Sequence, residues 1–234
     1  MANRAVAENL LANKAIQRLA GYASSCFSTW APKLFQYYQD HLNPLFIHSP
    51  NLKRNFPNSI FPGCTFNFGP QTVCVPHRDF ANLAFGLCSI TSLGKYDYLS
   101  GGHLILWELG IIIEFPPGST ILIPSACLTH SNTKIQTHEI RMSITQYAAG
   151  GLFRWVRYGF RKEEDFKRDK DSWDKELEER KHRWAIGLDL FSTLDDLRQS
   201  SVSAWCSNNN NIQVYCSFSM ISPHHNYVSI MCYM

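Results

Sequence analysis

Short apolar runs, separated by glycine and proline clusters, fill the middle of this 234-residue chain. These runs are rich in β-branched or apolar residues, and we expect strands at residues 64–68, 83–90, 104–108, 111–115, 120–123 and 140–147. Gly101-Gly102 and Pro116-Pro117-Gly118 mark turns between them. Short strands with turn signals at this spacing predict an all-β sandwich or barrel in this region.

Helical patterns precede the expected strands. Residues 2–22 place leucine and isoleucine at roughly helical spacing, with alanines between them. Residues 32–41 form a second expected helix, because Pro32 suits the first helical position and Pro44 lies just beyond the end. The Asn- and Pro-rich residues 51–62 are expected to form a loop.

The composition changes again after the expected strands. Residues 161–184 carry dense charge of both signs, which indicates an exposed helix with intrahelical ion pairs, and a DNA-contacting helix is the alternative. Residues 199–234 contain no Asp, Glu, Lys or Arg, and we expect an atypical, disordered tail there. The predicted organisation is a helical N-terminal flank, a β core, a charged helical segment and this tail. Their boundaries are 1–56, 57–161, 162–198 and 199–234.

The composition excludes some classes of protein. Hydrophobic residues make up 45% and charged residues 18% of the chain, so a real core can form. The net charge of +3 is too small to argue nucleic-acid binding from charge alone. The 8 cysteines include no CxxC pair, and they indicate free thiols in a reducing compartment. The N-terminus lacks the apolar run of a signal peptide, and no run is long enough to cross a bilayer. We therefore expect an intracellular protein that is neither secreted nor embedded in a membrane.

Two histidines and an aspartate predict a metal centre. Ferrous oxygenases need two neutral imidazoles and one carboxylate on one face of the metal, so that positions stay open for a cosubstrate and O2. His77 and Asp79 follow the strand-like apolar run at residues 73–75, and alternation along a strand would put both side chains on one face. His130 follows the expected strand at residues 120–123 and is the candidate third ligand.

An arginine downstream of His130 predicts a cosubstrate site. Arg141 lies in the expected strand 140–147, at about the distance from a distal iron histidine that is usual for the arginine that binds the far carboxylate of 2-oxoglutarate. The guanidinium fork matches a carboxylate bidentately. Ser143 lies two positions further on, so it shares a strand face with Arg141 and can add a hydrogen bond.

Each of these signals has an ordinary alternative. A single His-x-Asp pattern occurs by chance in many proteins, His130 could be a core or surface histidine, and Arg141 could be a structural ion-pair partner. The order, the spacing and the β-rich context together favour an iron and 2-oxoglutarate site over coincidence. His103 and His138 are then structural or exposed.

Several short motifs between Phe61 and Arg161 resemble TET/JBP dioxygenases, and most of all the fungal branch associated with transposons. They are Pro76-His77-Arg78-Asp79-Phe80-Ala81-Asn82, Gly101-Gly102-His103-Leu104, Glu114-Phe115-Pro116-Pro117-Gly118-Ser119, His130-Ser131-Asn132, and Arg141-Met142-Ser143 followed by Gly150-Gly151-Leu152-Phe153-Arg154-Trp155. The resemblance covers less than half of the chain. It implies an α+β protein with a double-stranded β-helix (jelly-roll) core, N-terminal flanking helices and a C-terminal charged helix.

The resemblance also implies a function. Fe(II) and 2-oxoglutarate would be the cofactors and O2 a co-reactant, with His77, Asp79 and His130 as catalytic iron ligands. Arg141 and Ser143 would bind 2-oxoglutarate. The partner would be DNA with a flipped-out methylated base, 5-methylcytosine first and N6-methyladenine as an alternative.

The resemblance assigns fewer residues to substrate binding than to the binding of the cofactors. Asn82 would contact the flipped base, and Tyr147 would lie at the base pocket. Animal members of the family carry a base-contacting histidine where this chain has Ala149. A nuclear location follows from the expected substrate.

Other functions stay open at this point. The same iron site could serve RNA, a protein or a small molecule. A third hypothesis is a catalytically degenerate, DNA-binding remnant of a mobile element. Arg154, Arg157 and Arg161 could hold phosphates or form a solvated rim.

Overall fold

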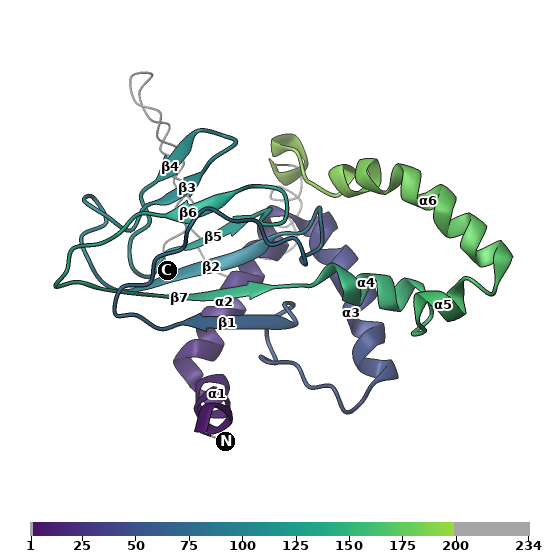
Figure 1. The fold of residues 1–234 in the computed structure, drawn as a ribbon, viewed down its shortest axis with the longest axis horizontal. Helices are drawn as coiled ribbons and strands as arrows, with labels where there is room; N and C mark the ends of the chain where they lie inside the picture. Colours follow the sequence, from purple (N-terminus) through teal and green to yellow (C-terminus); the bar gives the residue numbers. More distant parts are fainter. Residues whose placement is uncertain (1, 199–234) are drawn as a thin grey trace, which may run out of the picture. The chain divides into compact units, whose positions relative to one another are not determined.

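The structure is a computed structural model, and it describes residues 2–198. Its described part divides into two compact units (Figure 1). A helical unit comprises residues up to Pro62 together with those from Ala149 onward, and a sheet unit comprises Gly63–Ala148. The β core is thus narrower than the expected 57–161, because the sequence from residue 149 onward belongs with the helices. The expected tail, 199–234, lies outside the described residues.

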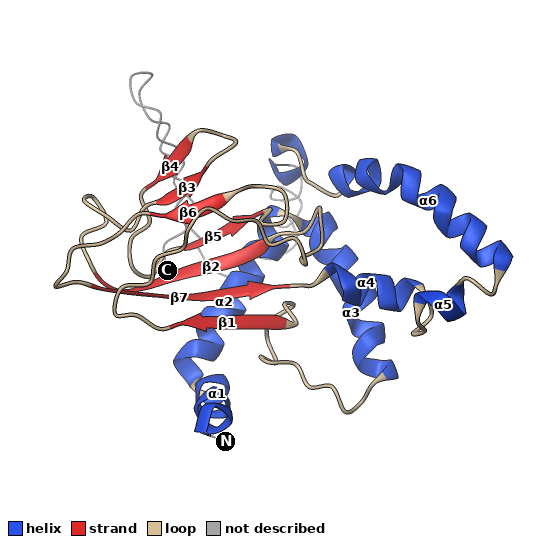
Figure 2. Ribbon diagram, viewed as in Figure 1, coloured by secondary structure: helices blue, strands red, loops and turns tan. Residues whose placement is uncertain are grey.

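The sheet unit contains two antiparallel sheets (Figure 2). The four-stranded sheet has the order β1-β7-β2-β5, with bounds Gly63–Asn67, Ile140–Tyr147, Cys88–Lys95 and Thr120–Ile123. The three-stranded sheet has the order β4-β3-β6, with bounds Ile111–Ile113, Leu104–Leu106 and His130–Asn132. Non-consecutive strands lie side by side in both sheets, so distant parts of the sequence meet here.

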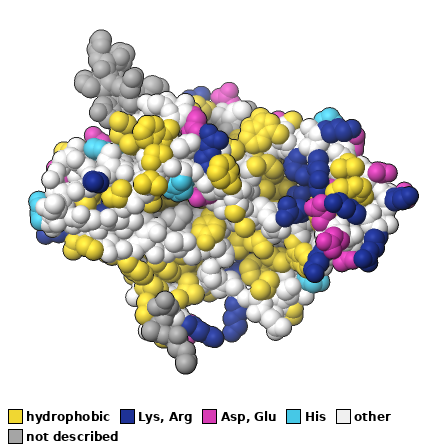
Figure 3. Space-filling view, viewed as in Figure 1, with side chains coloured by type: hydrophobic (Ala, Val, Ile, Leu, Met, Phe, Trp, Pro, Cys, Tyr) yellow, Lys and Arg dark blue, Asp and Glu magenta, His cyan; other side chains and the backbone are white. Residues whose placement is uncertain are grey.

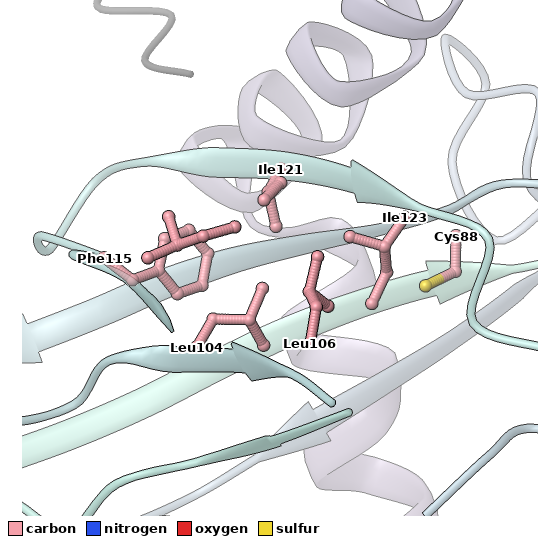
Figure 4. Close-up of a cluster of buried hydrophobic side chains, with 7 residues drawn as sticks. Cys88, Leu104, Leu106, Phe115, Ile121 and Ile123 are labelled. Carbon is pink, nitrogen blue, oxygen red and sulfur yellow. The ribbon is translucent and has the colours of Figure 1, made fainter. Parts of the chain in front are cut away.

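Apolar side chains fill the space between the two sheets. Figure 4 shows Leu104 and Leu106 of β3 pointing toward Ile121 and Ile123 of β5, with Phe115 beside them. All five side chains are at least nine-tenths buried. Burial of one such side chain contributes roughly 1.5–3 kcal/mol. The apolar runs that the sequence analysis identified at residues 104–108, 111–115 and 120–123 therefore hold the two sheets face to face.

The second strand does not lie where its apolar run predicts. We expected it at residues 83–90, whereas β2 spans Cys88–Lys95. Leu83 and Phe85 are buried, but from irregular backbone. The strand instead buries hydroxyl residues such as Thr91, whose hydroxyl oxygen lies 2.8 Å from that of Thr120 on β5. Such paired hydroxyls can occupy a sheet interior without an apolar signal in the sequence.

An irregular segment, residues 72–77, runs along the free edge of β6. The backbone groups of His77 and His130 exchange two hydrogen bonds of 3.1 and 3.0 Å. Further along, the Asn132 side chain accepts a hydrogen bond from Cys74 N at 2.8 Å and donates to Thr72 O at 3.2 Å. The regular strand expected at residues 73–75 is therefore absent, because a side chain supplies part of the ladder and Pro76 has no N–H to donate.

The first helical region divides at Asn13 instead of forming one helix over residues 2–22. α1 spans Ala2–Ala12 and α2 spans Lys14–Trp30. The Asn13 side-chain oxygen accepts hydrogen bonds from the backbone N–H groups of Ala15 and Ile16 at 2.9 and 3.3 Å. Asn13 is thus an N-cap that begins a second helix.

The next helix runs past its predicted end. α3 spans Pro32–His48 and contains Pro44, which we expected to lie beyond it. Leu42 and Leu45, on either side of Pro44, are buried at 0% and 3% exposure. Their packing offsets the hydrogen bond that proline removes from a helix interior.

Aromatic side chains make the core of the helical unit. α4, Gly150–Arg157, returns to pack on α3. Phe27 lies edge-on to Tyr38, with ring centroids 5.0 Å apart, and Tyr38 lies 5.0 Å from Phe153 of α4. The helices on either side of the sheet unit in sequence therefore share one core.

The charged segment forms α5, Glu163–Phe166, and α6, Lys170–Asp189. Figure 3 shows acidic and basic side chains interleaved over these helices, and Lys181–Glu178 at 2.5 Å is one intrahelical pair. Glu176 is the buried exception, and it pairs with Arg157, Arg180 and Arg183. The expected ion pairs are present, but the segment expected to form one helix forms two. No helix within residues 2–198 is long and apolar enough to cross a membrane.

Candidate metal and cosubstrate site

The structure brings the three predicted metal ligands together. His77 belongs to the irregular segment beside β6, Asp79 follows two residues later, and His130 is the first residue of β6. Their ligand atoms lie within 4.8 Å of one another. Within residues 2–198 no other group of three such residues is found. A backbone bridge joins the two histidines. Pairing of two backbone segments therefore brings the ligands together, and alternation along a single strand that carries His77 and Asp79 does not.

Backbone carbonyls fix which nitrogen each imidazole offers. His77 Nδ1 lies 2.8 Å from Val75 O, and His130 Nδ1 lies 3.0 Å from Leu128 O. A carbonyl oxygen can only accept, so each Nδ1 carries the hydrogen and donates. Nε2 of each ring is then the unprotonated nitrogen, as a metal ligand must be.

The Asp79 carboxylate presents two different oxygens. Oδ1 lies 3.8 Å from His77 Nε2. Oδ2 accepts a hydrogen bond from Asn82 Nδ2 at 3.3 Å, and the same amide donates to Ser125 Oγ at 3.1 Å. The backbone N–H of Asp79 also donates to Ser125 O at 2.9 Å. One oxygen is therefore held by the protein while the other faces the histidines.

The donor set suits Fe(II). Two neutral imidazoles and one carboxylate from three positions are the ligands of ferrous oxygenases, and they leave coordination positions open for small molecules. His130 is buried at 5% exposure, whereas His77 is exposed. One side of the group is thus packed and the other is accessible.

A cavity of about 300 Å³ adjoins the metal ligands. Its opposite wall is the inner face of β7, from which alternate residues point inward, and β1 adds two polar side chains. Those of β7 are Arg141, Ser143, Thr145 and Tyr147, and those of β1 are Thr65 and Asn67. The register pairs Asn67 with Ser143 and Thr65 with Thr145, so the polar residues form two adjacent rows.

Arg141 is a buried cation with spare hydrogen-bonding capacity. Its exposure is 3%, and Nη1 donates to Thr72 O at 3.1 Å. Nε is buried without a hydrogen-bond partner, and within residues 2–198 no carboxylate forms a salt bridge with this arginine. An isolated buried charge is destabilising by several kcal/mol unless a counter-charge arrives. The cavity end at Arg141 therefore fits a carboxylate ligand.

Ser143 adds a second donor beside Arg141. Its Oγ accepts a hydrogen bond from Asn67 Nδ2 at 3.0 Å. A hydroxyl that accepts one bond keeps its own hydrogen for another acceptor. Arg141 and Ser143 at one end of the cavity and three metal ligands across it fit 2-oxoglutarate, whose two ends need a carboxylate site and a metal.

Tyr147 and Asn82, the predicted base contacts, both line this cavity. The Tyr147 hydroxyl accepts a hydrogen bond from Thr65 Oγ1 at 3.3 Å. A Cβ at Gly63, the residue opposite, would lie 2.7 Å from the Tyr147 ring, so glycine there makes room for the ring. The Asn82 amide nitrogen is already bonded to Asp79 and Ser125. Contact with a base stays a prediction for both residues.

Several residues around the site were not singled out by the sequence. They are Asn67, Thr72, Glu108, Ser125 and Thr129. Asn132 also holds the site together, but it belongs to one of the motifs quoted above. Each acts through a contact made by folding, and no spacing pattern marks it.

The three arginines considered for phosphate binding lie in the helical unit. Arg157 pairs with Glu176 at 3.4 Å. Arg161 pairs with Asp169 at 3.6 Å and donates to Tyr158 O at 2.9 Å. These contacts assign both side chains to internal pairs, which favours a structural role for them over phosphate binding.

Comparison with known proteins gives structural neighbours only. No protein-family model and no curated protein matches this chain. Among solved structures, NgTET1 in complex with 5mC DNA matches with a TM-score of 0.37 and 19% identity, over 51% of this chain and 53% of that one. The viral collagen prolyl hydroxylase vCPH from Paramecium bursaria chlorella virus-1, as its 2OG complex, matches with a TM-score of 0.28 and 13% identity, over 47% and 70%. The chain spans about half the length of the first of these structures.

Proposed function

We propose that this chain is a 2-oxoglutarate- and Fe(II)-dependent dioxygenase that oxidises the methyl group of a modified base in DNA. One observation carries the proposal. The imidazole–carboxylate group of His77, Asp79 and His130 shares a cavity with Arg141, a buried cation that forms no salt bridge with any carboxylate of residues 2–198. An iron site alone or a buried arginine alone has many explanations, whereas the two facing one cavity match the two ends of 2-oxoglutarate.

The strand order supports a double-stranded β-helix as the scaffold. The four-stranded sheet lies against β4-β3-β6, and residues 72–77 extend that smaller sheet as an irregular fourth member. Two facing sheets that together contain eight strands are typical of jelly rolls. In this scheme the metal ligands lie on the smaller sheet and the cosubstrate residues on the larger one.

The chain's own residues would bind and orient the reactants. His77, Asp79 and His130 would hold Fe(II), and Arg141 with Ser143 would hold the far carboxylate of 2-oxoglutarate. Bound Fe(II) and 2-oxoglutarate would together supply the oxidation of a C–H bond by O2, with release of succinate and CO2. The protein contributes position through these side chains, and the apolar Ile90 and Leu104 in the cavity lining contribute to the exclusion of water.

A nucleobase in DNA is our first choice of substrate. A cavity of about 300 Å³ cannot admit a duplex, so a base would have to flip out of the helix to reach the metal. Tyr147 offers a ring for stacking, and Thr65 and Thr145 offer hydroxyls for the base edge. The motifs that resemble TET/JBP dioxygenases, and their fungal transposon-associated branch, support 5-methylcytosine first and N6-methyladenine second. A nuclear location is part of this proposal.

Product analysis tests the proposal directly. The full chain would be incubated with Fe(II), 2-oxoglutarate and duplexes that carry 5-methylcytosine, N6-methyladenine or no modification, with His77→Ala as the control. Mass spectrometry should find an oxidised base in one modified duplex and succinate in proportion to it. Succinate without an oxidised base would transfer the proposal to an oxygenase of RNA, protein or small molecules. DNA binding without succinate would indicate a degenerate remnant instead.

A further inference from the structure

Three polar side chains connect the two backbone segments that carry the metal ligands. Arg78 lies between His77 and Asp79, and Thr129 immediately precedes His130. Glu108 reaches both of them from the turn between β3 and β4. None of the three belongs to the ligand group or lines the cavity.

The contacts among these side chains form a closed ring, which we call the Arg78–Glu108–Thr129 network. Glu108 Oε1 accepts from Arg78 Nη2 and from Thr129 Oγ1, both at 2.5 Å. Glu108 Oε2 accepts from the backbone N–H of Thr129 at 2.7 Å. Arg78 Nε donates to Thr129 Oγ1 at 2.9 Å. Both Glu108 oxygens and the Thr129 hydroxyl therefore have partners within the network.

We propose that the Arg78–Glu108–Thr129 network positions the metal ligands, by fixing the His77–Asp79 segment at a set distance from His130. This inference rests on the proposed metal site but not on the proposed substrate. Other ties between the two segments lie on either side of Arg78. The backbone bridge at His77 and the contacts of Asn132 with Thr72 and Cys74 lie on its N-terminal side, and the Asp79 N–H donates to Ser125 O at 2.9 Å on its C-terminal side. The network adds the tie at Arg78 itself, between two of the ligands, and it ends at Thr129, the residue next to His130.

The chemistry of Glu108 suits this role. Hydrogen bonds from Thr129 and from Arg78 lower the pKa of its carboxyl from 4.5 to about 2. Glu108 is therefore an ionised acceptor for these hydrogen bonds. Partners that surround metal ligands in this way commonly change metal affinity by about 10- to 100-fold when they are removed.

Because the network is little buried, an effect on metal binding can be distinguished from an effect on the stability of the fold. The side chains of Arg78 and Glu108 are 40% and 35% exposed. Exposed ion pairs contribute little to stability. Variants of the network should therefore fold, and their effect should appear in metal binding.

Metal binding without turnover tests the inference. Glu108→Gln and Thr129→Val would be compared with the wild type by titration calorimetry with Mn²⁺, by the visible absorption of bound Co²⁺, and by the Tm in EDTA. Mn²⁺ affinity should fall about tenfold or more and the Co²⁺ spectrum should change, with little change in Tm. Thr129→Ser keeps the hydroxyl and should resemble the wild type.

Glu139→Gln is the matched control. The Glu139 carboxylate also accepts backbone hydrogen bonds within the sheet unit, from Asp97 N at 2.6 Å and Gln136 N at 2.8 Å, but it does not contact the ligand segments. It should leave Mn²⁺ affinity unchanged. Unchanged affinity in Glu108→Gln and Thr129→Val, or a wild type that binds no divalent metal, would overturn the inference. A wild type that binds metal but oxidises no DNA base would refute the proposed substrate and leave the network intact.

Discussion

Replacing Arg141 by methionine should act in opposite directions on the free protein and on its binding of 2-oxoglutarate. In the free protein, methionine fills a similar volume and removes a buried charge that has no counter-ion. Thr72 O loses the donor Nη1 but keeps Asn132 Nδ2 at 3.2 Å, so no carbonyl is left unsatisfied. Replacing buried charge by well-packed apolar groups is often neutral or stabilising, by about 1–4 kcal/mol. The metal-free Arg141→Met protein should be at least as stable as the wild type.

The effect on the cosubstrate follows from the same burial. A bidentate guanidinium–carboxylate pair contains two charge-assisted hydrogen bonds, each worth roughly 1.5–3 kcal/mol. Their loss should weaken 2-oxoglutarate by about 3–6 kcal/mol, which is roughly 10²- to 10⁴-fold in Kd. Ser143 still offers a hydroxyl, so binding at the metal end should persist weakly.

Calorimetry with Mn²⁺ in place of Fe(II) measures this binding without turnover. The Tm provides a second measure, because a ligand that binds only the folded state raises it with concentration. 2-Oxoglutarate should raise the Tm of the wild type and not that of Arg141→Met. Lys95→Met is the control, because it removes an exposed cation at the end of β2, opposite Ile140 in the same sheet. A Kd within threefold of the wild type, or a free Arg141→Met protein that is several kcal/mol less stable, would refute the reasoning.

Three further results are expected. His77→Ala should abolish succinate production, and turnover that survives in this variant would contradict the site assignment. Asn82→Ala should weaken Mn²⁺ binding about tenfold, because Asp79 loses the donor to Oδ2; unchanged affinity would restrict Asn82 to the substrate. Burial raises the pKa of the Cys88 thiol from 9.0 to about 12. Because the pKa in the folded state is the higher one, Cys88 stabilises the fold below pH 9, and this contribution is lost between pH 9 and 12. After treatment with iodoacetamide at pH 8.5, mass spectrometry should find Cys88 unmodified until the protein unfolds.

Two strands lie where their β-branched residues predict them, and isoleucines are buried in both, Ile121 and Ile123 in β5 and Ile144 in β7. β5 and β7 coincide with the expected residues 120–123 and 140–147. β2 was displaced, because its interior is built from hydroxyl residues such as Thr91 and the apolar run before it is buried from a loop. Hydrophobic alternation reports which residues are buried and not which backbone is extended.

In the candidate site, too, some residues could be placed from the sequence and others could not. Arg141 and Ser143 could be placed on one face because they lie on a regular strand, where the period of two holds. Alternation along a strand was expected to bring His77 and Asp79 to one face, but this explanation was wrong. Their segment is not a regular strand, and the Asn132 side chain makes some of the hydrogen bonds that a paired strand would make. What holds Asp79 comes from Asn82 and Ser125, and what holds Arg78 comes from Glu108 and Thr129.

These partners share a physical reason for escaping prediction. Ser125 lies 43 residues from Asn82 along the chain, and Glu108 lies 30 from Arg78. A polar residue in a turn has no periodicity, and its partner is decided by how two sheets close around a core. Metal ligands can be named from one sequence because iron chemistry restricts the residue types allowed. The residues that position them are restricted only by the hydrogen bonds that they make. Thr129→Ser keeps its hydroxyl and should therefore be tolerated, whereas every substitution at His130 removes an imidazole ligand.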